Sequence, residues 1–158
     1  MDLKEKVEEI AGRYPERRSA LLPALFLAQK KYGYLTKEAM EEVASILGLL
    51  PVQVYEVATF YTMFNKKPVG KFHVQVCTNV SCSLLGSEMI VNCLKKKLGI
   101  KVGETTRNKL FTLTEVECLG SCGTAPMMQI NDTYYENLTE KKVENILNEL
   151  RSTVAVKA

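Results

Sequence analysis

The spacing of apolar residues changes near residue 68, and this change constrains the fold more than any other feature of the sequence. Residues 37–47 place apolar side chains every three or four positions, which is the repeat of an amphipathic helix. Residues 72–76 alternate apolar and polar side chains, which is the repeat of a strand. The polar stretch 65–70, which contains Pro and Gly, lies between them. The sequence therefore predicts a helical part, residues 1–67, and a part with a sheet, residues 68–158.

Four helices are expected in the helical part, because each apolar stripe there has a local start or stop signal. Such stripes are typical of helices that pack against one another in a small bundle. The signals are Pro15 after the first stripe, Ser19 as the N-cap and Gly33 as the end of the second helix, Thr36 and Gly48 around the third, and Pro51 in the first turn of the fourth.

The second part is expected to alternate strands and helices. A closing helix carries Val143, Ile146, Leu147 and Leu150 on one face, and residues 84–98 show the same helical spacing. We therefore expect an α+β protein in which a small sheet is packed against helices. The expected strands cover residues 72–77, 109–116, 127–131 and 133–136.

Composition and charge exclude several classes of protein. The chain is 46% hydrophobic and 25% charged, as in ordinary globular proteins. Its lysine clusters at 66–67 and 95–97 have no interleaved aromatic residues, so we expect solvated surface there and no nucleic-acid binding. No apolar run reaches the roughly 18 residues of a membrane span, and the N-terminus does not resemble a signal segment. We expect a cytoplasmic protein without direct membrane insertion.

Five cysteines give the strongest indication of chemistry. Cys77 and Cys82 are separated by four residues, Cys118 and Cys122 by three, and 35 residues lie between the two pairs. Each pair follows a predicted strand, so the two are expected in neighbouring loops at one end of the sheet. A reducing compartment disfavours disulfides. The pairs therefore predict metal ligation, whereas Cys93 lies on the apolar side of a predicted helix and is expected to be buried and inert.

Spacing alone leaves the use of the four cysteines open. Structural zinc sites also take four cysteines in two pairs with short separations. A thiol-disulfide oxidoreductase is disfavoured because the usual Cys-x-x-Cys pair is absent, and a simple core role conflicts with the polar, glycine-bearing surroundings. Those small residues would allow backbone N–H groups to approach the sulfurs of an anionic iron–sulfur cluster, which needs such donors when it is buried.

The single histidine and the missing nucleotide motifs narrow the possibilities further. One histidine is too few for a Rieske centre or for the usual catalytic zinc sites, and His73 is expected on the polar side of its strand, at the surface. Neither G-x-G-x-x-G nor G-x-x-x-x-G-K-[ST] occurs in the sequence. We therefore expect no catalytic residue in this chain and an electron source on another subunit.

The cysteine segments resemble a known family. Residues 117–126 read Glu-Cys-Leu-Gly-Ser-Cys-Gly-Thr-Ala-Pro, and residues 77–82 read Cys-Thr-Asn-Val-Ser-Cys with Gly86 after them. Together with Ala-Thr-Phe-Tyr at residues 58–61, they resemble the thioredoxin-like 2Fe-2S ferredoxin subunit of respiratory complex I, the 24 kDa or E subunit. The similarity extends from about Leu22 to Leu150.

This resemblance implies a fold and a cofactor. An N-terminal helical bundle is followed by a thioredoxin-like α/β domain with a small sheet. The domain holds one 2Fe-2S cluster, with Cys77 and Cys82 on one iron and Cys118 and Cys122 on the other. Pro126 corresponds to a proline that is typically cis in thioredoxin-like folds.

The resemblance also implies partners. The family serves NADH-quinone oxidoreductase, an oxidoreductase of the respiratory chain, where the subunit pairs with a flavoprotein subunit that binds NADH and FMN. One-electron storage or tuning at that flavin is the implied role. NADH and FMN are expected on the partner only, so the isolated chain should not oxidise NADH. The implied location is cytoplasmic, or peripheral at the cytoplasmic face of the inner membrane within a larger complex.

Two alternatives to complex I follow from the same considerations. Close relatives of this subunit serve NAD-linked hydrogenases and formate dehydrogenases, and one sequence does not separate these assemblies. The other alternative is a non-catalytic adaptor stabilised by zinc on the same four cysteines.

Overall fold

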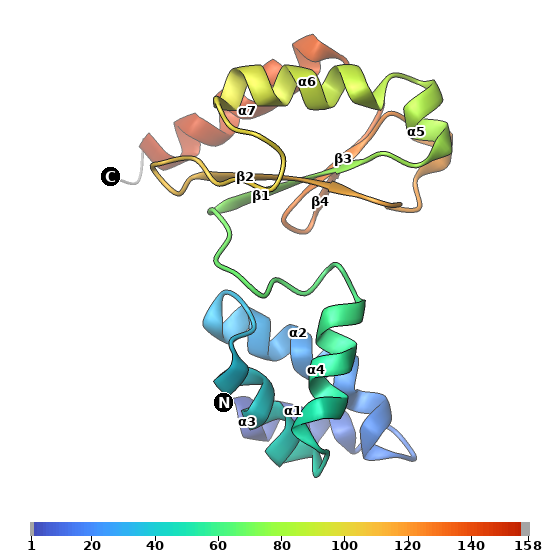
Figure 1. Ribbon diagram of the computed structural model, residues 1–158, viewed down its shortest axis with the longest axis vertical. Coiled ribbons are helices and arrows are strands. Elements are labelled where there is room, and N and C mark those ends of the chain that lie inside the picture. Colours follow the sequence, from blue (N-terminus) through green and yellow to red (C-terminus); the bar gives the residue numbers. More distant parts are fainter. Residues whose placement is uncertain (1, 156–158) are drawn as a thin grey trace. The chain divides into compact units, whose positions relative to one another are not determined.

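The computed structural model describes residues 2–155 and divides the chain between Val69 and Gly70 (Figure 1). The unit that ends at Val69 is helical, and the unit that begins at Gly70 contains the sheet. The helical unit contains α1 (Leu3–Ala11), the 3-10 helix η1 (Arg17–Ala20), α2 (Leu21–Tyr32), α3 (Lys37–Leu47) and α4 (Pro51–Phe60).

Local signals set most helix ends of the helical unit. The Thr36 hydroxyl accepts a hydrogen bond of 3.1 Å from the Ala39 N–H and caps α3. Gly48 ends α3 in the left-handed conformation, and Pro51 opens α4. The expected N-cap at Ser19 is wrong, because residues 17–20 form η1, which leads directly into α2 without a side-chain cap.

Buried apolar side chains from all four α-helices form the core of the helical unit. Leu25, Val43 and Val54 are completely buried, and Phe64 covers the core from the segment after α4. Each such side chain stabilises the fold by about 1.5–3 kcal/mol relative to exposure. This packing confirms that the expected apolar stripes face one another.

The sheet of the second unit has strand order β2-β1-β3-β4. β1 runs parallel to β2, from Phe72 opposite Phe111 to Cys77 opposite Val116, and antiparallel to β3, which pairs antiparallel with β4. β1 is therefore a central strand. The elements are β1 (Phe72–Cys77), α5 (Val80–Leu84), α6 (Ser87–Leu98), β2 (Phe111–Val116), the 3-10 turn η2 (Cys122–Thr124), β3 (Met128–Ile130), β4 (Thr133–Tyr135) and α7 (Glu140–Ala155).

α6 and α7 lie side by side on one face of this sheet (Figure 1). Ile90 and Leu94 of α6 and Leu147 of α7 pack against Val74 and Leu113 of the strands. The expected α+β architecture is confirmed. Among residues 2–155, none of the helices has the length and the apolar content that a membrane crossing requires.

Two expectations for the second unit are wrong. The expected helix at 84–98 begins earlier and is interrupted, because Gly86 has a φ of +93° between α5 and α6. His73 is buried, with its Nε2 2.9 Å from the Thr114 hydroxyl. A strand paired on both sides exposes little of its backbone and few of its side chains, and this position of β1 was not visible in the alternating pattern.

Candidate functional site

The four paired cysteines lie at the carboxyl ends of β1 and β2. Cys77 is the last residue of β1 and Cys82 lies in α5, and both are buried. Cys118 follows β2, Cys122 begins η2, and both are exposed. The ends of two parallel neighbouring strands meet at one edge of a sheet, which brings the segments together. The expected loop placement is wrong for Cys82, because a short helix capped by Asn79 carries it.

Contacts among the sulfurs join the two pairs. The Cys77 thiol interacts with the thiols of both Cys82 and Cys118, and the charge of Cys122 acts on Cys82. Met127 packs against Cys77 and Cys82 and closes the site on its inner side. The fifth cysteine, Cys93, lies elsewhere, in the core between α6 and the sheet. The structure thus gathers the four predicted residues and separates Cys93 from them.

The two buried thiols differ in acidity. Burial opposes ionisation of Cys77, but N–H groups of Asn79 and Leu119 and the neighbouring thiols outweigh it, so the pKa of Cys77 is below its ordinary value. Burial, together with the adjacent Cys77, raises the pKa of Cys82 to about 11, although the Met127 N–H acts in the opposite direction. Backbone donors are therefore directed at both sulfurs.

A backbone donor also reaches the sulfur of Cys118. The Gly120 N–H lies 3.3 Å from Cys118 Sγ. Gly120 has a φ of +75°, a conformation that side-chain-bearing residues rarely adopt, and the small residue allows the chain to turn back toward the sulfur. The sequence had indicated small residues in this loop, and the structure gives one of them a specific contact.

The carboxylate of Glu136 holds the segment around Cys122. The hydroxyls of Ser121 and Thr124 both donate hydrogen bonds to Glu136 Oε1, the latter at 2.7 Å. These two bonds, that from Ser121 first, lower the pKa of Glu136. The Asn137 N–H also donates to the Thr124 carbonyl at 2.7 Å. Sequence reasoning missed Glu136, because it lies 12 and 15 residues from its partners and belongs to no local motif.

The backbone after Cys122 is fixed from both sides. The peptide bond between Ala125 and Pro126 is cis, as expected. The Leu138 N–H donates to the Pro126 carbonyl at 2.9 Å, and the Cys77 N–H donates to the Met127 carbonyl at 3.2 Å. The second cysteine segment is therefore attached to the end of β1 on one side and to the segment before α7 on the other.

The donor set fits a 2Fe-2S cluster. Within residues 2–155, no three Cys, His, Asp or Glu side chains are grouped so as to hold one metal ion. A 2Fe-2S cluster asks for two thiolates at each iron, because bridging sulfides complete each set of ligands. Two cysteine pairs supply these thiolates, and N–H groups directed at three of the sulfurs suit an anionic group.

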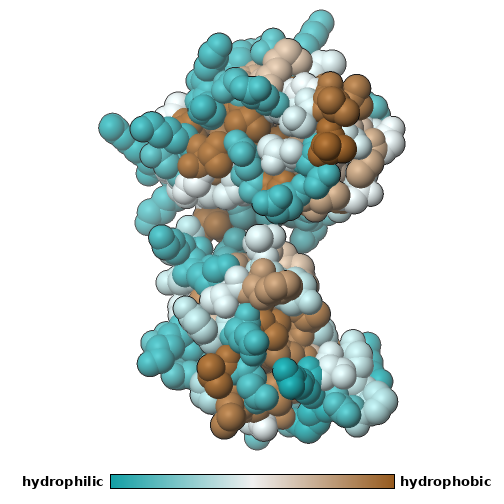
Figure 2. Space-filling view, turned by 45° about the vertical axis from the view of Figure 1, so that its right-hand side comes forward, coloured by the Kyte–Doolittle hydropathy of each residue, from teal (hydrophilic) through white to brown (hydrophobic). Residues whose placement is uncertain are grey.

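Apolar side chains are exposed next to the cysteines. Figure 2 shows apolar surface over the end of the second unit that carries α5. Val80, Leu84, Leu85 and Met89 contribute to it, and Leu84 is 83% exposed. We call these four residues the α5 patch. Leu85 and Met89 were expected to face the core, but the interruption at Gly86 turns both outward.

Comparisons with known proteins agree with this geometry. The family model described as "Thioredoxin-like [2Fe-2S] ferredoxin" matches residues 7–151. The second of the E subunits of NADH-quinone oxidoreductase in Rhizobium meliloti (strain 1021) is 50% identical over 99% of this chain and 93% of that protein. The E subunit of NADH-quinone oxidoreductase in Rickettsia conorii (strain ATCC VR-613 / Malish 7) is 52% identical over 92% of this chain and 89% of that protein.

A solved structure supports the fold. A chain of an NAD+-reducing [NiFe]-hydrogenase in the air-oxidised state superposes with a TM-score of 0.73 at 22% identity. The superposition covers 85% of this chain but only 23% of the hydrogenase chain, so it speaks for the fold alone. The family model and the two full-length relatives establish the classification: this chain belongs to the thioredoxin-like [2Fe-2S] ferredoxin family.

Proposed function

We propose that this chain is the electron-transfer subunit of an NADH-quinone oxidoreductase of the complex I type. Cys77, Cys82, Cys118 and Cys122 hold one 2Fe-2S cluster, which exchanges single electrons with the FMN of a partner flavoprotein. The observation that carries the proposal is the meeting of the two cysteine pairs at one edge of the sheet, with backbone donors directed at the sulfurs. Relatives that match nearly the whole chain are subunits of NADH-quinone oxidoreductase.

The residues of the chain prepare the site for an anionic group. The lowered pKa of Cys77 favours the thiolate, which is the form that ligates iron. The N–H groups of Asn79, Leu119, Met127 and Gly120 stabilise negative charge on the sulfurs. When bound, the cluster supplies a one-electron couple in which one ferric iron is reduced to ferrous iron and no substrate bond is made or broken.

We place the flavoprotein contact on the α5 patch. Four apolar side chains exposed beside Cys82 are unusual for a free surface and are typical of a protein interface. Electron exchange requires the donor to come close to the cluster, and the patch borders the site directly. NADH and FMN reside on that partner, and attachment to the cytoplasmic face of the inner membrane occurs through the larger complex.

Metal analysis of the anaerobically purified chain tests the cofactor. We expect two irons and two sulfides per chain, a visible spectrum of sulfide-to-iron charge transfer, and an electron paramagnetic resonance signal that appears only after dithionite reduction. A colourless protein with one zinc and no iron, which iron and sulfide fail to reconstitute, would make the chain a zinc-stabilised adaptor.

Binding to the flavoprotein tests the partner. Co-expressed with the flavoprotein subunit of its own complex, the chain should co-purify with it, and Leu84→Glu should weaken this association by disturbing the apolar contact. Met63→Glu, which changes a half-exposed apolar residue of the helical unit, serves as the control. NADH should reduce the complex but not the isolated chain. Undiminished association of the Leu84→Glu variant would exclude the α5 patch as the contact.

A further inference from the structure

A pocket at the other end of the sheet has no role in the proposed electron transfer. It has a volume of about 650 Å³ and lies between the end of α6, the loop before β2 and α7. Phe111, the first residue of β2, forms part of its wall. The cysteine site begins beyond the other end of that strand, and six residues of strand span about 20 Å. A ligand in this pocket is therefore separate from the cysteines.

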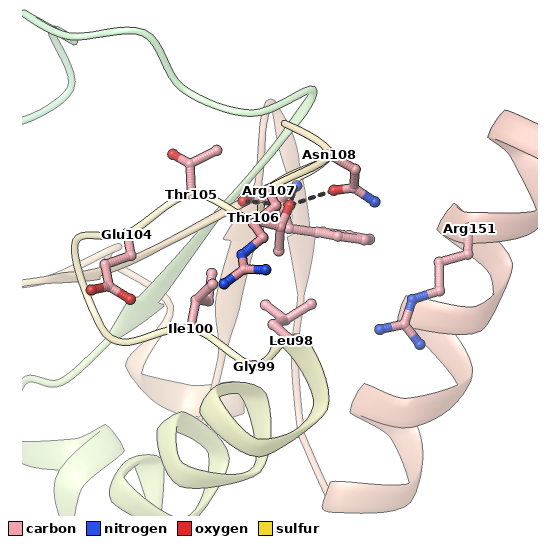
Figure 3. Close-up of a pocket in the computed structure, with 10 residues that line it drawn as sticks. Leu98, Gly99, Ile100, Glu104, Thr105, Thr106, Arg107, Asn108 and Arg151 are labelled. Carbon is pink, nitrogen blue, oxygen red and sulfur yellow. Dashed lines mark hydrogen bonds between the residues drawn. The ribbon is translucent and has the colours of Figure 1, made fainter.

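Two arginines direct their charges into this pocket. Figure 3 shows the guanidinium groups of Arg107, from the loop, and Arg151, from α7, pointing into the space from two sides. Within residues 2–155, neither forms an ion pair with a carboxylate. The carboxylate of Glu104 also lines the pocket, but it accepts a hydrogen bond of 2.8 Å from the Lys101 N–H and turns toward its own loop. The pocket is therefore positively charged.

Arg151 is held in place by the protein. One of its nitrogens donates a hydrogen bond of 3.0 Å to the Lys97 carbonyl near the end of α6. Its guanidinium carbon lies 5.9 Å from the centre of the Phe111 ring. A guanidinium has five N–H donors, so most of them stay available to a ligand. The side chain thus presents donors from a fixed position, which lowers the entropic cost of binding.

The remaining polar groups of the pocket are donors as well. Asn108 Oδ1 already accepts hydrogen bonds from the Thr106 hydroxyl at 2.7 Å and the Leu110 N–H at 3.1 Å. Its amide nitrogen is the group left for a ligand. Leu98 and Ile100 add apolar surface to the lining. A rim of donors above an apolar wall matches a ligand that has only acceptors at one end and an apolar group at the other.

We infer that this pocket binds a small organic phosphate, with Arg107 and Arg151 on the phosphate group and Leu98 and Ile100 against the organic part. Paired guanidiniums bind phosphate oxygens through charge-assisted hydrogen bonds. The volume lies within the range of small-molecule sites, roughly 300–1,000 Å³. The inference is independent of the proposed function, because it holds whichever metal the cysteines carry.

Titration of the full-length, metal-loaded chain with phenyl phosphate tests the inference, followed by calorimetry and by amide shifts in heteronuclear NMR. We expect saturable binding with shifts centred on Gly99 and residues 104–108. Inorganic phosphate should bind more weakly, because it lacks the apolar part, and uncharged benzyl alcohol should not bind. Benzoate separates the two anion classes: binding weaker than that of phenyl phosphate supports a phosphate site, and tighter binding overturns it.

Variants locate the site. Arg107 lies on an exposed loop, so Arg107→Gln should leave the fold intact and weaken phenyl phosphate binding about tenfold. Arg151→Gln should have a similar effect and retains an amide that can bond to the Lys97 carbonyl. Arg18→Gln, in the helical unit, should change nothing. Unchanged affinity in both pocket variants, or an equal loss in Arg18→Gln, would refute the proposal.

Discussion

The carboxylate of Glu136 accepts a hydrogen bond of 2.7 Å from the hydroxyl of Thr124, two residues after Cys122. Ser121, the residue before Cys122, donates to the same oxygen. One carboxylate thus holds the chain on both sides of a proposed ligand, from a position next to the end of β4. Because hydrogen bonds to a charged acceptor are stronger than neutral ones, this carboxylate should limit the motion of the segment.

Replacing Glu136 should therefore loosen the cluster without removing a ligand. We expect Glu136→Ala to release iron to a chelator several-fold faster than the wild type, and Glu136→Gln, which still accepts hydrogen bonds, to lie between them. Bleaching of the visible spectrum in the presence of the chelator measures the rate. Glu149→Ala, an exposed change on α7, is the control, and equal rates in all four proteins would show that the clamp is dispensable.

The cysteines should fall into two groups. Replacement of Cys77, Cys82, Cys118 or Cys122 by Ser should lower the iron content or change the reduced-state spectrum, because serine is a poor substitute for a thiolate at iron. Cys93→Ser should leave the spectrum unchanged, since Cys93 is buried in a separate core. Iron analysis and electron paramagnetic resonance distinguish the groups. Comparable damage in Cys93→Ser would contradict the assignment of the ligands.

Gly70 should tolerate no side chain. A Cβ at this position would lie 2.8 Å and 2.9 Å from backbone atoms of Phe111 and 3.0 Å from one of Leu110, and neither stretch of backbone can move without disturbing β2. We expect Gly70→Ala to destabilise the second unit by about 1–3 kcal/mol, measured by urea unfolding. Gly12→Ala, where the nearest atoms lie at 3.6 Å, should be close to neutral. Equal stability of the two variants would contradict this packing.

His73 should make stability dependent on pH. Its pKa is lowered by burial, so the unfolded chain binds a proton more readily than the folded chain. The stability that neutral His73 provides is complete above its ordinary pKa of about 6.5 and is lost as pH falls toward its lowered folded-state pKa. The urea midpoint of the wild type should therefore fall more between about pH 7.5 and pH 5.5 than that of His73→Gln. Parallel losses in both proteins would assign the dependence to other groups.

Local signals in the sequence predicted those parts of the fold that depend on neighbouring residues. Thr36 and Gly48 set the ends of α3 because a cap bond and a left-handed turn act within a few residues. The strand at 72–77 was predicted because its apolar residues alternate. Ser19 failed as a cap because the chain forms a 3-10 helix there, which shares the same local composition. The pattern of one strand could not reveal that β1 is central, so the burial of His73 was missed.

The candidate site shows the same division. Cysteine spacing and the strands before each pair predicted that four cysteines meet, and the resemblance to a family selected iron over zinc. The clamp by Glu136 and the outward orientation of Leu85 depend on contacts made after folding. A residue whose partners lie 12 or more positions away leaves no periodic signal, so one sequence could not reveal it.

The connection between Cys77 and Met127 has a consequence for the birth of the protein on the ribosome. The N–H of Cys77 is bonded to the carbonyl of a residue 50 positions later, and the next N–H, of Thr78, is bonded to Val116. During synthesis, Cys77 and Cys82 therefore emerge long before the segments that shelter them. The nascent chain exposes one cysteine pair alone until the third strand has left the exit tunnel, so loading with iron and sulfide in a single step must follow translation of most of the chain.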